Sequence, residues 1–294
     1  MKDQADVLRE RMAYVRQGAI KNTKVIAVVS GKGGVGKSNF VVNFAIALQQ
    51  LNKKVLVFDL DIGMANVDIL LGRTSFQSIV DMLEKDLNIR EIIEDGPEGL
   101  TFVSGGSGLT ELFEMNQQKI DIFIKQLFLL QQDYDYIIFD MAAGVSNDSL
   151  QFLLSAHEVI LVTTPEPTSI TDAYATIKYI HSQDKKLPIS LVVNRIHDRR
   201  EGPLTAENMA AVCSKFLGKE ITHLSTIPDD EAVSKAVRSQ TPFILKSPRA
   251  ESSKAIKETA KSYIGTTEIQ SDKGGNSLHS FVDRFTSFFR KQGI

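Results

Sequence analysis

A glycine-rich run at residues 31–38 constrains the fold of this chain more than any other part of the sequence. The run, Gly-Lys-Gly-Gly-Val-Gly-Lys-Ser, fits the pattern G-x-x-x-x-G-K-S/T, whose glycines let successive backbone N–H groups turn toward phosphate oxygens. A short β-branched apolar run precedes it at residues 24–30, and an apolar stretch of helical length follows at 37–51. This order predicts a buried strand, a phosphate-binding loop and a helix whose N-terminus faces the phosphates.

The polar residues of this loop have distinct expected roles. The Lys37 ammonium would reach the β- and γ-phosphates, and the Ser38 hydroxyl would bind Mg²⁺. Lys32 is unusual, because an ordinary phosphate loop has no use for a second cation near its start. The nucleotide-binding residues expected here are Gly31, Lys32, Gly33, Gly34, Val35, Gly36, Lys37, Ser38 and Asn39.

Apolar strand patterns alternate with helical patterns from residue 24 to about 264. This alternation predicts the α/β fold of a P-loop NTPase, in which a mostly parallel twisted sheet carries helices on both faces. The expected strands span 25–30, 54–59, 100–104, 135–140, 158–163, 188–194 and 223–227. The expected helices include 37–51, 116–131, 147–155, 168–182, 204–216 and 249–264.

Composition limits the classes of protein to which the chain can belong. A chain of 294 residues can bury a full core as one large domain or two modest ones. A net charge of −2 argues against a broad nucleic-acid footprint, and no apolar run approaches the length of about 20 residues that spans a membrane. The single cysteine, Cys213, fits a reducing cytosol.

Carboxylates follow two predicted strands at the sheet edge from which the phosphate loop also emerges. Asp59 and Asp61 end one strand, where Asp59 could hold a Mg²⁺-bound water and Asp61 could orient a water for attack on the γ-phosphate. Asp140 ends another apolar strand and would act on Mg²⁺ through water, which is the Walker B arrangement. The Gly144 N–H could contact the γ-phosphate and so respond to its loss.

Two later strands also end in polar residues, where the base of a nucleotide would lie. Asn194 and Arg195 end one strand, and Pro228 and Asp229 follow the next. An asparagine side chain can make paired hydrogen bonds to an adenine edge. From spacing alone, contact with a base and ordinary loop chemistry are equally compatible with these residues.

Four groups of residues together resemble the deviant Walker A ATPases, the family of MinD and ParA, over roughly residues 22–264. The resemblance implies ATP or ADP with Mg²⁺ as cofactors, an ATP-dependent homodimer in which Lys32 reaches the partner's phosphates, and slow ATP hydrolysis activated on dimerisation. Asn39 replaces a threonine of the family, and Met141 a small or polar residue. The groups are Lys32 to Ser38, Asp59-Leu60-Asp61, Asp140-Met141-Ala142-Ala143-Gly144 and Asn194-Arg195.

The N-terminal segment, 1–23, narrows the resemblance to the MinD-like regulators of flagellar number and placement. It contains their D-Q-A-x-x-L-R motif, which implies stimulation of the signal-recognition-type GTPase FlhF; flagellar C-ring proteins are further partners implied by the family. Apolar residues at helical spacing predict a short helix here, and the alternative is a tail helix docked on its own domain. The motif residues are Asp3, Gln4, Ala5, Leu8 and Arg9.

The C-terminal segment predicts a reversible membrane anchor. A small, polar stretch at 265–276 indicates a flexible linker after an ATPase domain at 24–264, and the segment 277–294 predicts an amphipathic helix with cations beside its apolar face. The alternative is a helix packed on its own core, which is also compatible with an anchor docked while unbound. The expected membrane contacts are Leu278, Phe281, Val282, Phe285, Phe288 and Phe289.

These features favour an ATP-driven switch that cycles between the cytoplasm and the inner face of the cell membrane and controls flagellum number and placement. The alternative from the same fold is a MinD-type ATPase that positions the division site. A ParA-type protein would need a basic DNA-binding face, and no nucleic acid partner is expected. An iron–sulfur carrier would need several cysteines, whereas the chain has one.

Overall fold

The computed structural model describes residues 22–61, 66–106, 116–130, 132–144, 147–271 and 277–292. Its strands are β1 (Lys24–Ser30), β2 (Val55–Leu60), β3 (Glu94–Asp95), β4 (Thr101–Val103), β5 (Tyr136–Ala143), β6 (Glu158–Thr163), β7 (Ile189–Ile196) and β8 (Thr222–Pro228). Its helices are α2 (Lys37–Gln50), α3 (Val67–Leu70), α4 (Ile79–Lys85), α5 (Ile89–Ile92), η1 (Pro97–Gly99), α6 (Gln117–Phe128), α7 (Asn147–Ser155), α8 (Pro167–Gln183), α9 (Glu201–Leu217), α10 (Glu231–Arg238), α11 (Phe243–Lys246), α12 (Glu251–Ser271) and α13 (Leu278–Gln292).

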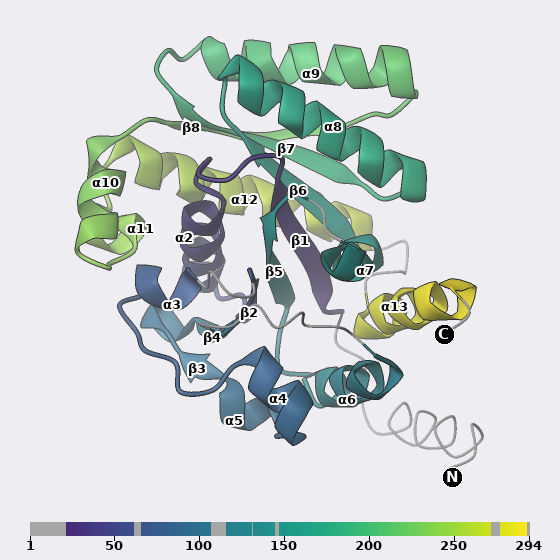
Figure 1. Ribbon diagram of the computed structural model, residues 1–294. Coiled ribbons are helices and arrows are strands. Elements are labelled where there is room, and N and C mark those ends of the chain that lie inside the picture. The colour runs from purple at the N-terminus through teal and green to yellow at the C-terminus, as the bar shows by residue number, and fades with distance from the viewer. Residues whose placement is uncertain are drawn as a thin grey trace.

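The strands form one sheet in the order β3-β4-β2-β5-β1-β6-β7-β8. All neighbouring strands are parallel except the short β3, which runs antiparallel to β4. In Figure 1 helices cover both faces, with α2 and α12 on one side and α6, α7 and α8 on the other. The predicted P-loop NTPase fold is therefore confirmed.

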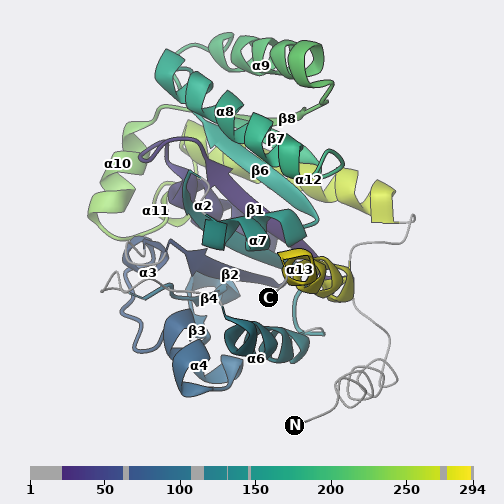
Figure 2. The same ribbon diagram turned by 45° about the vertical axis from the view of Figure 1, so that its right-hand side comes forward.

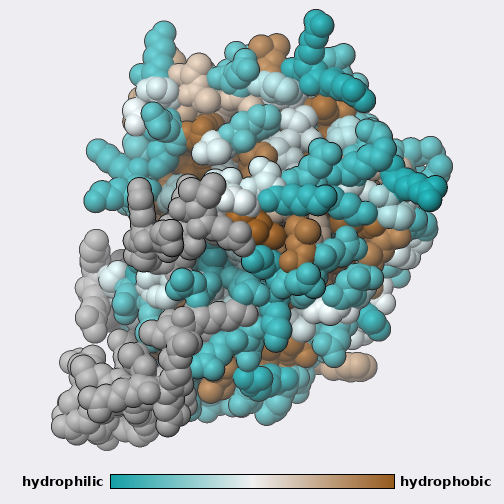
Figure 3. Space-filling view, turned by 180° about the vertical axis from the view of Figure 1, so that it is seen from behind, coloured by the Kyte–Doolittle hydropathy of each residue, from teal (hydrophilic) through white to brown (hydrophobic). Residues whose placement is uncertain are grey.

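The central strand β1 explains why the sheet has a separate core on each face. All seven of its residues are buried, and they alternate between the two faces: Val25, Ala27 and Val29 join one apolar cluster, while Ile26 and Val28 join the other. The face shown in Figure 3, outside its grey atoms, is mostly hydrophilic with small separate apolar areas. Most large apolar side chains of the described residues thus lie in these two cores.

The largest difference between the predicted and the observed element boundaries lies at the C-terminal end of α12. The linker was expected to begin at residue 265, but α12 continues to Ser271. Glycine and paired threonines at 265–267 have no strong helix propensity, so the local sequence favoured a linker. Adding residues to a helix that already packs on the core costs little free energy, and α12 therefore continues beyond the end of its apolar pattern. Residues 272–276, and the N-terminal motif at 3–9, lie outside the described part of the chain.

The C-terminal helix α13 packs on the core through its apolar face. Leu278, Phe281, Val282 and Phe285 are each at most 1% exposed. The helix lies beside α6 and α7 (Figures 1 and 2) and belongs to the cluster on their face of the sheet. The side chains of Phe288 and Phe289 lie outside the described part of the chain. Of the helices described here, none has both the length and the apolar character needed to cross a bilayer.

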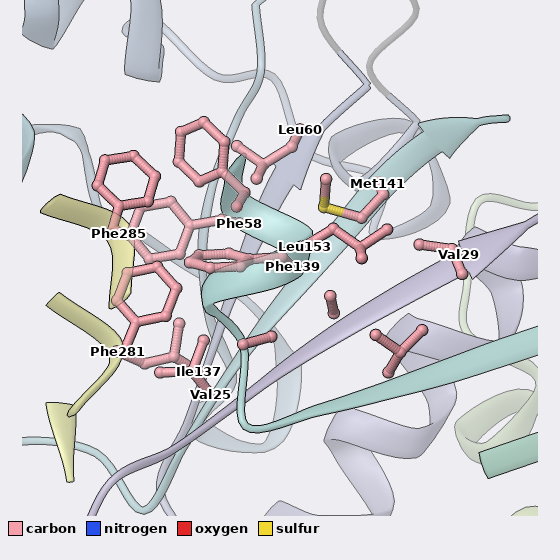
Figure 4. Packing of buried hydrophobic residues seen from close by; sticks show 14 of the residues in the cluster. Val25, Val29, Phe58, Leu60, Ile137, Phe139, Met141, Leu153, Phe281 and Phe285 are labelled. Atoms are coloured by element: carbon pink, nitrogen blue, oxygen red, sulfur yellow. The ribbon is translucent and has the colours of Figure 1, made fainter. Parts of the chain in front are cut away.

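Aromatic rings join α13 to the strands that lead to the predicted nucleotide site. The Phe281 ring lies 5.5 Å from that of Phe139 on β5, and Phe139 lies 5.5 Å from Phe58 on β2. Phe285 lies 5.0 Å from Phe152 of α7 and 5.5 Å from Phe123 of α6. Figure 4 shows Phe281 and Phe285 directed from α13 into this cluster. Such tilted and edge-to-face pairs add to the stabilisation that burial alone provides.

Candidate nucleotide-binding site

The phosphate loop emerges from the carboxyl end of β1 and leads directly into α2, as its sequence predicted. Gly34 and Gly36 have φ angles of +80° and +91°, in the left-handed region where residues with a Cβ are strained. A Cβ on Gly36 would also lie 2.4 Å from the amide nitrogen of Asn194. Gly36 caps α2 without a side-chain hydrogen bond, so the first N–H groups of the helix remain available to an anion.

The centre of the site is an ion pair between Lys37 and Asp140. The Lys37 Nζ donates to Asp140 Oδ1, and both side chains are almost fully buried. Ser38 Oγ lies 3.4 Å from Lys37 Nζ. The second carboxylate oxygen of Asp140 is buried and has no hydrogen-bond partner among the described residues. A buried carboxylate oxygen without a partner, next to a serine hydroxyl, suits a hydrated Mg²⁺.

Asp59 lies beside this pair and holds the segment that follows β2. Its Oδ1 accepts from the Asp61 N–H at 3.0 Å, and its Oδ2 accepts from the Asn66 and Val67 N–H groups at 2.8 and 3.0 Å. Burial, together with the negative charge of Asp140, raises the pKa of Asp59 to about 7 in spite of these donors. Asp59 therefore anchors the backbone at Asp61, a role that the spacing of the two aspartates did not indicate.

Asp61 lies next to the centre at the carboxyl end of β2, as expected. Burial raises its pKa above the ordinary value, the positive charge of Lys37 opposes this, and the charge of Asp140 adds to it. The charge of Asp140 thus acts on both Asp59 and Asp61, and the charge of Lys37 acts on Asp61. The Gly144 N–H, expected near the γ-phosphate, instead donates to the Ser30 carbonyl at 2.9 Å. That bond has to open before Gly144 can contact a phosphate.

A cavity of about 610 Å³ adjoins the phosphate loop at the carboxyl ends of β6, β7 and β8, a volume that suits a nucleoside. Within it, the Asn194 Nδ2 donates to the Val35 carbonyl at 2.7 Å, so Asn194 supports the phosphate loop and keeps its Oδ1 for a ligand. The residues expected near the base all line this cavity: Asn194, Arg195, Pro228 and Asp229.

Several residues that line the cavity were not predicted from the sequence. Thr164 is 3% exposed, and its hydroxyl has no partner within the described part of the chain. Glu166, His197 and Glu201 also line the cavity. Thr164 and Glu166 follow β6 at the same sheet edge as the expected residues, so strand position was the signal that could have found them.

Lys32 lies away from the Lys37–Asp140 pair of its own subunit. Its side chain is 46% exposed, with Nζ 3.3 Å from Thr168 Oγ1 and 4.0 Å from the Glu166 carboxylate, both beside the start of α8. An exposed pair at this distance is weak, because solvent screens it. The two lysines of the loop therefore occupy different environments, one buried at the centre and one at the surface.

Comparison with known proteins agrees with this geometry. The profile of the ParA family described as NUBPL iron-transfer P-loop NTPase matches residues 21–264. The chain is 34% identical to the antiactivator FleN of Pseudomonas aeruginosa over 269 residues, which cover 92% of this chain and 95% of FleN. It is also 34% identical to the flagellum site-determining protein YlxH of Helicobacter pylori over 272 residues, which cover 91% of each chain.

Solved structures give the same result. The septum site-determining protein MinD of Pyrococcus horikoshii OT3, complexed with Mg-ADP, matches with a TM-score of 0.70 and 26% identity over 85% of this chain and 99% of MinD. The chain belongs to the ParA/MinD family of P-loop NTPases. Within that family its relatives include FleN and YlxH, which are FlhG homologues.

Asn194 provides a test of the site. The Asn194→Ala substitution removes both the support of the Val35 carbonyl and a polar group of the cavity. We expect ATP to bind about tenfold more weakly, because one buried hydrogen bond contributes about 1 kcal/mol or somewhat more. Isothermal titration calorimetry measures this, with Lys235→Ala on the exposed surface of α10 as the matched control. Equal affinities for the two variants would contradict the assignment.

Proposed function

We propose that this chain is an ATP-dependent dimerising switch that cycles between cytosol and membrane and controls the number and placement of flagella. The names of two relatives support the flagellar role: one is a flagellum site-determining protein and the other an antiactivator. The observation that supports the switch is the position of Lys32, the second lysine of the phosphate loop. Its side chain is exposed and lies outside the Lys37–Asp140 pair of the same subunit. A surface lysine in a phosphate loop is useful chiefly to the nucleotide of a second subunit.

The bound nucleotide would occupy the loop and the adjoining cavity. The N–H groups of the loop and Lys37 would bind the phosphates, and Ser38, Asp59 and Asp140 would hold Mg²⁺ directly or through water. Magnesium would neutralise charge that develops on the phosphates. Because Lys37 is already paired with Asp140, phosphates have to compete with that carboxylate for the ammonium. Nucleotide binding would therefore rearrange the centre of the site.

The base of the nucleotide is proposed to be adenine. One N–H of the Asn194 amide donates to the Val35 carbonyl and fixes the side chain, so its Oδ1 and its second N–H remain for a ligand. Adenine presents an amino group at its sixth position beside a ring-nitrogen acceptor, so Oδ1 and the remaining N–H of Asn194 can form paired hydrogen bonds with its edge. This pairing supports ATP as the nucleotide.

Hydrolysis is proposed to depend on Asp61 and on a partner subunit. Asp61 would orient the attacking water, and the Lys32 of a second subunit would stabilise negative charge on the phosphates, as an arginine finger does. In a single subunit this Lys32 lies beside Glu166 and Thr168 instead. Hydrolysis would then be slow and would occur only after dimerisation, so that it limits the lifetime of the ATP-bound state.

Asp61→Ala tests this assignment of the water-orienting residue. We expect ATP hydrolysis to fall at least a hundredfold, because general-base or water-positioning groups contribute about 10²–10⁴-fold. Nucleotide binding and ATP-dependent dimers should persist, which phosphate-release assays and light scattering on the same sample can show. Asp68→Ala, on α3 beyond the site, is the control. A wild-type rate in Asp61→Ala would reject the role of Asp61.

Membrane binding is proposed to use the apolar face of α13, which in this structure is buried on the core. The helix would have to leave the core before Leu278, Phe281, Val282 and Phe285 could enter a bilayer. One short amphipathic helix binds membranes weakly, but a dimer presents two, and the second then binds at high effective concentration. ATP-dependent dimerisation would in this way become ATP-dependent membrane binding.

Vesicle co-sedimentation tests the anchor. Deleting residues 277–294 should abolish sedimentation with anionic vesicles in the presence of ATP. Since the deletion also exposes the apolar core surface under α13, the double substitution Arg290→Glu, Lys291→Glu provides a second variant that leaves the buried face unchanged. It should reduce binding to anionic vesicles more than to zwitterionic ones, because each basic residue contributes about 1 kcal/mol near an anionic surface. Unchanged sedimentation of the deletion variant would show that membrane binding does not depend on α13.

The N-terminal motif, Asp3 to Arg9, is proposed to stimulate the GTPase FlhF. It lies outside the described residues, so the support comes from its sequence alone. A peptide of residues 1–20 should raise the GTP hydrolysis rate of FlhF, whereas a scrambled peptide of equal composition should not. Inactivity at saturating peptide would favour the second candidate, a MinD-type ATPase that positions the division site, whose solved structures share this fold.

A further inference from the structure

His157 connects the first turn of α13 to the central sheet. It lies just before β6 and is 5% exposed. Its Nδ1 accepts the backbone N–H of Val25 at 2.8 Å, and its Nε2 lies 2.7 Å from the Ser280 hydroxyl. The Ser280 hydroxyl in turn donates to the Ser277 carbonyl at 2.8 Å. One imidazole therefore links β1, at the centre of the sheet, to the helix that is proposed to leave the core.

These contacts determine the protonation state that docking requires. Since Nδ1 accepts from a backbone N–H, it carries no proton, and in the neutral ring the proton is on Nε2. Nε2 is then the donor to the Ser280 hydroxyl, whose own proton is used toward Ser277. If Nδ1 also carried a proton, the Nδ1–H and the backbone N–H of Val25 would face each other, and neither could accept a hydrogen bond. The Val25 bond belongs to the core and persists when α13 leaves, so what docking adds against a second proton is the cover of the helix and the charge of its Arg284.

The charged groups around the ring also oppose a second proton. Arg284 of α13 donates to the Ala156 carbonyl at 2.9 Å, and Lys24 of β1 lies close enough to affect the ring electrostatically. The nearest carboxylate along the chain, Glu158, is already paired with Lys24 at 2.6 Å. It also accepts from Ser190 of β7 at 2.5 Å and from the Tyr263 hydroxyl of α12 at 2.8 Å. Its charge is therefore largely compensated by other groups.

We propose that His157 is a pH-sensitive latch: its neutral imidazole holds α13 on the core, and its protonation favours release of the helix. The inference rests on the proposed function in one respect, namely that α13 can leave the core. It adds the residue that controls this step and the signal to which the step responds.

The direction of the pH effect follows from proton linkage. Burial under α13, then the charges of Arg284 and Lys24, lower the pKa of His157 to about 3. An exposed histidine has a pKa of about 6.5, and release of α13 moves the pKa of His157 toward that value by removing the cover of the helix and the charge of Arg284. Docking is therefore fully stabilised above about pH 6.5 and weakens progressively as the pH falls from there toward 3. An anionic membrane at a surface potential of about −30 mV lowers the local pH by about half a unit, so the membrane itself would assist release.

Methyl NMR of the full chain, without nucleotide or lipid, tests the latch. The Leu278 and Val282 methyl groups lie among aromatic rings in the docked state and lose their ring-current shifts on release. Between pH 7.5 and 5.5 we expect the docking equilibrium to weaken about tenfold in the wild type. In His157→Gln, whose carboxamide keeps an acceptor and a donor but does not titrate, the equilibrium should stay within about twofold. An equal pH response in both proteins would overturn the proposal.

Two further measurements keep the test decisive. Ser280→Ala removes the Nε2 partner but not the titrating ring, so docking should weaken at every pH while its pH dependence remains. If α13 of His157→Gln is undocked at every pH, the titration of the His157 imidazole in the wild type provides the test. The pKa of His157 should be lower in the full chain than in the chain lacking residues 277–294. Equal pKa values would overturn the latch. Failure of the membrane proposal appears separately, as absent vesicle binding at any pH with the NMR response intact.

Discussion

The parallel pairing of β5 with both β1 and β2 is the constraint on which the rest of the site depends. In this register Asp140 lies opposite Val28 of β1 and opposite Asp59 of β2. The phosphate loop therefore begins three residues beyond the level of Asp140, and Lys37 near its far end pairs with that carboxylate. Two buried aspartates side by side are unfavourable unless cations or N–H groups compensate them. Lys37 and the backbone N–H groups after β2 supply that compensation.

The same two strands also connect the site to α13. Phe58 and Phe139 directly precede Asp59 and Asp140, and their rings point into the cluster that the helix covers. Release of α13 would expose Phe139 and Phe152 to water, at about 1.5–3 kcal/mol for each large apolar side chain that becomes fully exposed. A bilayer or a second subunit has to compensate that exposure. Docking and the proposed membrane binding would therefore compete for one apolar face, and the proposed latch at His157 would shift the balance between them.

Much of the site could be predicted from the sequence, because its chemistry lies in short motifs at strand ends. The phosphate loop, the two strand-terminal aspartates and the Asn194 and Pro228 turns follow apolar strands, and parallel strands end at a common edge. Other features required the folded chain. Nothing in the spacing of Asp59 and Asp61 indicates that the first holds the backbone of the second, and the Gly144–Ser30 bond joins segments more than a hundred residues apart. Thr164 and Glu166 reach the cavity only because β6 lies beside β1.

The sequence by itself determined the class of fold, the phosphate-binding loop and the amphipathic character of the last helix, since all three depend on local patterns of glycine, charge and apolar residues. The tertiary structure decided what those patterns contact. It placed Lys37 in the buried centre and Lys32 at the surface, although both belong to one loop. It also placed the apolar face of α13 against the core, where His157 meets Ser280 across 123 positions of sequence. Such partners are set by the packing of whole elements, which no local pattern specifies.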